Sequence, residues 1–257
     1  MRRLAIAVVF LFSTGAVAQN PSSDPFAIRL AQSSVAALVA AATVNDMTLN
    51  ANVTSIFGGD YETGTATFRG KGINESRVDL NLTGQTRTDV RNSINGVPAG
   101  AWEKNGDNST AYAQHNCWTD AVWFFPALSS LTQTSNLAFI FKYIGQEQHG
   151  GVSVQHIAVF QTFKHDSAGW LQGLTVMHFY LDLNSNLPLA AGFRVHPDSD
   201  MSYNIPSEVR FANYQSVSGI QIPFHIQSLL NGALSLDITV TNATFNTGLP
   251  DSLFTLP

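Results

Sequence analysis

Residues 231–241 read NGALSLDITVT and join a tight-turn signal to an alternating strand pattern. The Asn-Gly pair favours a two-residue hairpin turn, because both residues tolerate positive φ angles. After it, polar residues alternate with four apolar ones, as in a strand with one buried and one solvated face. The apolar positions are Leu234, Leu236, Ile238 and Val240. The segment therefore predicts one strand of an antiparallel hairpin.

The same signals recur through the chain. Val78, Leu80 and Leu82 alternate with charged or amide residues, which predicts another half-buried strand. Gly58-Gly59, Asn95-Gly96 and Asn105-Gly106 stand where further hairpins would reverse. We find no linker or repeat, and single β domains commonly reach this length. We therefore expect one mainly β, antiparallel domain over residues 19–257.

Two segments depart from simple alternation, because residues 152–163 and 174–183 are apolar on both strand faces. Such strands need a second layer, a lid or a ligand cavity to cover the second face. Thr119–Leu131 is the candidate cover, predicted as a short helix interrupted near Pro126. Residues 24–42, which open with Asp24-Pro25, predict an N-terminal helix. We expect no other helix.

The N-terminus predicts a secretory signal peptide over residues 1–18. Arg2 and Arg3 precede the apolar run Leu4–Phe12, and Ala16-Val17-Ala18 provides small residues for cleavage before Gln19. The alternative is a membrane anchor, but the run is far shorter than the roughly 20 residues that span a bilayer. We therefore expect a soluble protein that is periplasmic or secreted.

Charge and cysteine content exclude other classes. The 257 residues include 13 Lys and Arg against 18 Asp and Glu, a formal charge of −5. Binding to a nucleic-acid backbone depends on clustered basic residues, so we expect no nucleic-acid partner. The single cysteine, Cys117, excludes an intrachain disulfide framework.

Chemical motifs are sparse. His115-Asn116-Cys117 is the one local cluster that suggests a metal pair, or a nucleophile with its base. A zinc site needs more ligands, and the other histidines are spread singly along the chain. The sequence contains none of the common hydrolase, metalloprotease, dinucleotide or phosphate-loop motifs. We therefore expect no enzyme activity, no metal and no cofactor.

Aromatic residues gather between positions 102 and 143. They carry large apolar areas, so they can line a ligand pocket or form ordinary core, and composition alone leaves both open. The group comprises Trp102, Trp118, Trp123, Phe124, Phe125, Phe139, Phe141 and Tyr143.

The C-terminal half carries four pieces in a characteristic order. They are Tyr180–Pro188 (YLDLNSNLP), Phe211–Tyr214 (FANY), Gly219–Phe224 (GIQIPF) and the terminal Asp251–Phe254 (DSLF). Their order and spacing resemble the bacterial outer-membrane lipoprotein carrier superfamily, which is LolA/LolB-like. The resemblance covers about residues 24–257.

This resemblance implies a curved antiparallel half-barrel of about eleven strands. The N-terminal helix and the Thr119–Leu131 segment would form a lid over an apolar cavity for acyl chains. Such a carrier is expected to be a monomer that moves cargo between a membrane-bound donor and acceptor. Arg69 lies in the neighbourhood where these carriers use a strand arginine to hold the lid, although the flanking prolines are missing. The lipid-anchored, receptor-like member has an N-terminal cysteine that this chain lacks.

Three functions remain open at this point. The first is an exported carrier whose cavity is lined by aromatics and gains about 0.8 kcal/mol for each buried acyl methylene. Its candidate ligand-binding residues are Trp102, Trp123, Phe124, Phe125, Phe179 and Arg69. The second is a rigid extracellular β module that binds carbohydrate or protein through surface aromatics and has a filled interior. The third is a hydrolase that uses Cys117 and His115.

Overall fold

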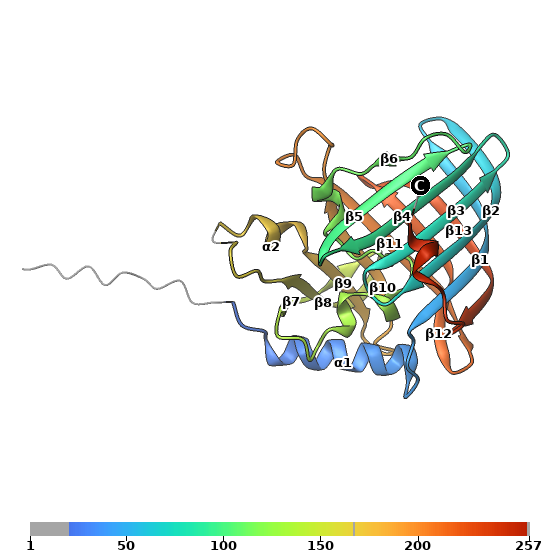
Figure 1. Ribbon diagram of the computed structural model, residues 1–257. Helices are drawn as coiled ribbons and strands as arrows, with labels where there is room; N and C mark the ends of the chain where they lie inside the picture. Colours follow the sequence, from blue (N-terminus) through green and yellow to red (C-terminus); the bar gives the residue numbers. More distant parts are fainter. Residues whose placement is uncertain (1–20, 167, 256–257) are drawn as a thin grey trace, which may run out of the picture.

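The computed structural model describes residues 21–166 and 168–255 (Figure 1). The predicted signal peptide and Gln19 lie outside these ranges. All strands join one antiparallel sheet of thirteen strands that curves without closing (Figure 1). The count exceeds the expected eleven. One of the strands, at an edge of the sheet, has only two residues, too few to show an alternating pattern.

The strands form two consecutive meanders. The first comprises β1 (Asp46–Phe57), β2 (Asp60–Lys71), β3 (Glu75–Leu82), β4 (Thr86–Ile94), β5 (Val97–Lys104) and β6 (Thr110–Ala111). The second comprises β7 (Phe139–His149), β8 (Val152–Gln161), β9 (Met177–Asp182), β10 (Pro188–Val195), β11 (Ile205–Val217), β12 (Ile220–Leu230) and β13 (Ala233–Phe245).

The two meanders meet where the first strand pairs with the last. β1 lies between β2 and β13, so the sheet order runs from β6 through β1 and β13 to β7. The edge strands β6 and β7 are therefore consecutive in the chain. Residues 112–138 must carry the chain from one edge of the sheet to the other.

The turns and alternation predicted from sequence are confirmed. Asn95, Asn105 and Asn231 all adopt positive φ, as hairpin turns of this kind require. In β13, Ile238 and Val240 are buried. This alternation defines an inner face, which carries the apolar core, and an outer face.

The strands expected to be apolar on both faces behave differently from each other. In β8, Ile157 and Val159 face the core, while His156 and Ala158 are buried on the outer face. Strand β9 begins only at Met177, because Leu174 belongs to the short helix α2 (Trp170–Leu174). The outer face of β9 carries His178, Tyr180 and Asp182, which are half-buried side chains rather than a continuous apolar stripe.

The N-terminal helix is confirmed as α1 (Pro25–Val39). The Asp24 side chain accepts a hydrogen bond of 2.7 Å from the Phe26 amide, which caps the helix as expected. The amide of Asp24 also donates to the Phe141 carbonyl at 2.7 Å, which ties the start of the helix to β7. Within the described ranges, no helix combines the length and apolarity needed to cross a bilayer.

The helix predicted over Thr119–Leu131 is wrong. The segment contains only the 3₁₀ turns η2 (Pro126–Leu128) and η3 (Ser130–Thr132). Pro126 cannot donate a helical hydrogen bond, and Ser129 Oγ accepts from the Leu131 amide and so caps a new turn. Helix α2 and the 3₁₀ turns η1 (Gln114–Cys117) and η4 (Asp251–Phe254) were not predicted, because such short turns carry no periodicity.

The chain end is held beside the start of β1. The buried Asp46 carboxylate accepts hydrogen bonds from the amides of Thr247 and Gly248, at 2.8 and 2.9 Å. Burial alone raises the pKa of Asp46, but these hydrogen bonds outweigh it and the pKa is lowered. Beyond this point, η4 packs on the outer face of β3 and β4 and buries Phe254 (Figure 1).

We expect Asp46→Ala to lower the free energy of unfolding by about 1–3 kcal/mol, since it removes the buried carboxylate that accepts from the amides of Thr247 and Gly248. Because the folded pKa is depressed, this stabilisation is present above the ordinary aspartate value and disappears as the pH falls through the folded pKa. Urea unfolding at neutral and acidic pH measures both effects. Asp60→Ala, at an exposed hairpin position, is the matched control. Equal losses for the two variants would contradict this assignment.

Candidate functional site

The inner face of the sheet is covered by residues 119–132, here called the central segment. Val122, Phe124, Phe125 and Leu131 of this segment have no exposed surface. They share one core cluster with Phe68 of β2 and with side chains from both meanders. The chain that connects the two edge strands therefore fills the concave side of the sheet.

Four of the residues predicted to bind ligand meet in this core. The ring of Phe124 lies 5.1 Å from that of Phe68, and the ring of Trp123 lies 6.1 Å from it. Phe125 packs 5.8 Å from Phe245 at the end of β13. Phe179 joins the same cluster from β9, so aromatics distant in sequence form one apolar centre.

The other two predicted residues lie apart from this centre. Trp102 pairs with Asp89 on the inner face of β5 and is half-buried beneath the Arg87 guanidinium, 4.6 Å from its ring. Arg69 neighbours the inward Phe68 and therefore faces outward, where it bonds to Asp79. Arg69 is thus on the opposite side of the sheet from the central segment.

The arginine that does hold the central segment is Arg91 of β4, which sequence reasoning missed. Its Nη2 donates to the carbonyls of Cys117 and Thr119, the latter at 2.9 Å. Burial lowers the pKa of Arg91. The alternation in β4 did not reveal this role, because Arg87, Asp89 and Arg91 lie opposite Val90, the buried residue of the strand, whose side chain faces outward toward η4.

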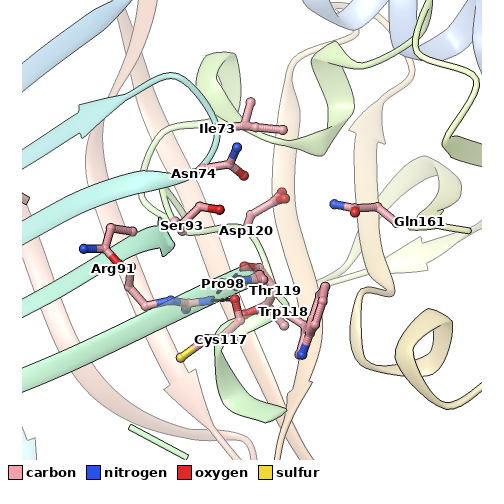
Figure 2. Close-up of a pocket in the computed structure, with 12 residues that line it drawn as sticks. Ile73, Asn74, Arg91, Ser93, Pro98, Cys117, Trp118, Thr119, Asp120 and Gln161 are labelled. Carbon is pink, nitrogen blue, oxygen red and sulfur yellow. Dashed lines mark hydrogen bonds between the residues drawn. The ribbon is translucent and has the colours of Figure 1, made fainter. Parts of the chain in front are cut away.

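A second polar contact joins the two ends of the central segment. The Asp120 carboxylate accepts from the Ser130 amide and from Ser130 Oγ, both at 3.0 Å. A small hollow of about 30 Å³ lies beside it, and in Figure 2 the side chains of Asp120 and Gln161, which both line it, point toward each other. Burial raises the pKa of Asp120 to about 6, although the Ser130 hydrogen bonds and Arg91 oppose this shift.

Gly70 of β2 allows the central segment to pack directly against the strand. A Cβ at this position would lie 2.6 Å from Cγ1 and 3.1 Å from Cγ2 of Val122. Any side chain here would collide with the segment, so glycine permits direct contact between the strand and Val122.

The Cys117 and His115 pair does not form a nucleophile and base. Cys117 is buried, with Sγ 3.9 Å from the Ala113 carbonyl, and burial raises the pKa of its thiol. His115 Nε2 instead lies 3.1 Å from the Pro197 carbonyl. Among the residues that the structure describes, no group of three or more His, Cys, Asp or Glu is arranged to hold a metal ion.

Solved structures share this architecture. A domain described as an outer membrane lipoprotein-sorting protein, from Vibrio parahaemolyticus, matches with a TM-score of 0.57 and 15% identity, covering 88% of this chain and 95% of that one. A LolA superfamily protein from Nitrosomonas europaea matches with a TM-score of 0.54 and 11% identity, covering 90% and 97%. The fold is that of the LolA superfamily.

A DUF1329 family protein from Desulfovibrio piger also matches this chain, with a TM-score of 0.56, 12% identity and coverage of 91% and 98%. No protein-family model matches the sequence. No curated protein sequence matches it either. The likeness to the LolA superfamily therefore lies in the three-dimensional fold.

We expect Gly70→Ala to destabilise this LolA-type sheet by about 1–3 kcal/mol, because the new methyl overpacks against Val122. Adding Val122→Ala should restore part of the loss by vacating that space. Gly192→Ala is the control, since a Cβ there meets nothing closer than 3.6 Å. Urea unfolding of the wild type, Gly70→Ala, Val122→Ala and the double variant measures the coupling. Additive effects of the two substitutions would show that position 70 and Val122 are not in tight contact.

Asp120 should also give stability a characteristic pH dependence. Its folded pKa of about 6 exceeds its ordinary value of 3.8, so the folded state retains a proton that the unfolded chain releases. The stability of the wild type relative to Asp120→Asn should therefore fall as the pH rises from the ordinary value through the folded value. Urea unfolding of both proteins over this pH range tests the prediction. A difference in unfolding free energy between the two proteins that stays constant with pH would contradict it.

Proposed function

We propose that the protein is an exported carrier that binds acyl chains of a lipid or lipoprotein between the inner face and the central segment. One observation carries this proposal. The apolar inner face of a LolA-type sheet is covered by a segment without α-helix, which is held by a few polar contacts at its ends. Such a cover can leave the sheet without breaking a strand.

Acyl-chain binding would exchange one apolar occupant for another. If the central segment moved away, Phe124 and Phe125 would leave space beside Phe68 and Phe179, which stay on their strands. An acyl chain in that space would recover about 0.8 kcal/mol for each buried methylene. No polar motif for the cargo is needed, which agrees with the scarcity of chemical motifs in the sequence.

The proposal assigns roles to the candidate residues. Trp123, Phe124 and Phe125 move with the cover, Phe179 lines the cavity floor and Trp102 lies beside it on β5. Arg91, rather than Arg69, keeps the cover closed. We further propose a monomer of one domain, formed by residues 19–257 after removal of the signal peptide. It would be periplasmic or secreted and would serve a membrane-bound donor and acceptor.

A second function is favoured by the filled interior. A rigid module needs no cavity and could bind carbohydrate or protein through exposed aromatics. Phe57 and Tyr61 at the β1–β2 hairpin are 85% and 71% exposed, and Trp170 of α2 is 61% exposed. Native mass spectrometry of protein purified without detergent separates the two functions. Bound acyl species support the carrier, whereas a bare protein that takes up no fluorescent fatty acid supports the module.

A reversible cross-link tests the position of the cavity. The contact between a Cβ at position 70 and Cγ1 of Val122 places the two Cβ positions about 4 Å apart, within disulfide range. We expect Gly70→Cys/Val122→Cys, made in a Cys117→Ser background, to take up fluorescent fatty acid when reduced and to lose uptake when oxidised.

The Cys117→Ser/Gly70→Cys protein, which cannot form the bridge, controls for the oxidant. Equal uptake by the oxidised and reduced double variant would refute a cavity beneath the central segment. Absence of uptake by the reduced variant and by the wild type would refute the carrier itself.

A further inference from the structure

The outer face of β9–β11 contains a hollow centred on Gly192. Its neighbour Ala191 pairs with Phe179 on one side and Val209 on the other, and all three belong to the inner core. Gly192 and its cross-strand partners His178 and Glu208 therefore face outward. Gly192, His178, Tyr180 and Glu208 line a groove of about 310 Å³.

Backbone geometry does not require a glycine at this position. A Cβ on residue 192 would make ordinary contacts, 3.6 Å from the Tyr180 ring, 3.7 Å from His178 Cβ and 3.8 Å from the Tyr180 hydroxyl. Glycine inside a strand weakens it and often marks the close approach of a ligand or another backbone. The position therefore indicates a space that is kept open between these side chains.

The groove carries a positive charge without a partner. Two arginines line it, Arg194 and Arg210, together with one carboxylate, Glu208. Glu208 bonds to Arg210 and lies 3.2 Å from His149 Nε2, so its charge is already compensated. Arg194 is exposed and forms no hydrogen bond or ion pair with a described residue. An anion would find an available guanidinium here.

Behind the groove, a carboxylate and two imidazoles form a chain across β7, β8 and β9. Glu147 Oε1 lies 3.0 Å from His156 Nδ1. The angle at Nδ1 does not suit a hydrogen bond, so the contact is an ion-pair distance only. His156 Nε2 lies 2.8 Å from His178 Nδ1. A carboxylate favours the proton on the nearer nitrogen of His156, whose Nε2 then accepts from His178 Nδ1–H. His178 Nε2 is left with a lone pair and has no partner among the described residues.

The neighbours of His178 keep it neutral. Its pKa is lowered first by burial, then by His156 and by Arg194, while Glu147 opposes the shift. The Tyr180 hydroxyl has no hydrogen-bond partner among the described residues, and His149 stacks on its ring at 3.8 Å. The groove thus presents a cation, a hydroxyl donor and an imidazole acceptor that are not used within the described chain.

We propose that this groove binds a hydrogen phosphate group, either inorganic phosphate or the monoanion of a phosphomonoester, since both carry a P–O–H. Arg194 binds the anionic oxygens, the Tyr180 hydroxyl donates to one of them, and His178 Nε2 accepts the hydrogen bond of the P–O–H group. A carboxylate or sulfate anion has no O–H to donate and would leave His178 Nε2 facing an acceptor. The site therefore distinguishes phosphate from these anions, and it is independent of the carrier function.

Isothermal titration calorimetry with inorganic phosphate near neutral pH tests the site. We expect Arg194→Gln to weaken binding at least about tenfold, the usual loss for a charge-assisted hydrogen bond. Gly192→Leu should abolish binding by filling the hollow. Arg29→Gln removes the same charge from an exposed position on α1 and should leave binding unchanged. Thermal melts establish that each variant is folded. If Gly192→Leu fails to fold, Arg194→Gln still tests the site, because Arg194 is exposed and its substitution does not disturb the core.

Selectivity provides the second measurement. Sulfate should bind at least about tenfold more weakly than phosphate to the wild type, because it leaves the imidazole acceptor unpaired. The preference should shrink in His178→Phe. Absence of phosphate binding, equal binding of sulfate, or equal effects of Arg194→Gln and Arg29→Gln would each overturn the proposal.

The source of the phosphate group is distinguished by two further ligands. These ligands are measured at about pH 6, where roughly half of a phosphomonoester keeps its P–O–H. Binding of sn-glycerol 3-phosphate without binding to phosphatidate vesicles would support a soluble phosphate ligand. Binding to phosphatidate vesicles above phosphatidylcholine vesicles, lost in Arg194→Gln, would support a lipid headgroup.

Discussion

The pairing of the first strand with the last determines the arrangement of the other elements. The β1–β13 ladder joins two meanders into one sheet and places β6 and β7 at its edges. Because these edge strands are consecutive, the connecting chain has to cross between them, and it does so over the inner face. The cover of the core is therefore a consequence of strand order. Asp46, at the start of β1, binds the chain after β13 and secures the same junction.

Two ionisable side chains fix the cover while apolar packing stabilises it. Phe124 and Phe125 contribute buried apolar surface, but such packing is non-directional and does not specify one position. Arg91 and Asp120 bond to backbone groups near the two ends of the central segment, and these bonds depend on direction. Buried charges add little net stability, and in some proteins they specify one arrangement. Arg91 and Asp120 have the contacts expected for that role.

Sequence patterns predicted the sheet better than they predicted the site. Strand alternation and Asn-Gly turns depend only on residues that are neighbours in the sequence. The turns at Asn95 and Asn231 and the strand β13 could therefore be predicted. The central segment was misread as helix because Pro126 and Ser129 divide it into separate turns. Arg91 was missed because a charged strand residue is normally solvated, and only strand pairing shows that it faces inward. The groove at Gly192 depends on five strands and has no local signal.

The central ladder also affects when the chain can fold. Its two strands lie at opposite ends of the sequence, so their contacts have the longest separation in the sheet. Contacts of this kind form slowly, because a long loop must close before any pairing energy is gained. A chain that emerges from its N-terminus can complete neither its sheet nor its core until β13 is available. This delay agrees with the proposed export, in which the polypeptide would cross a membrane unfolded.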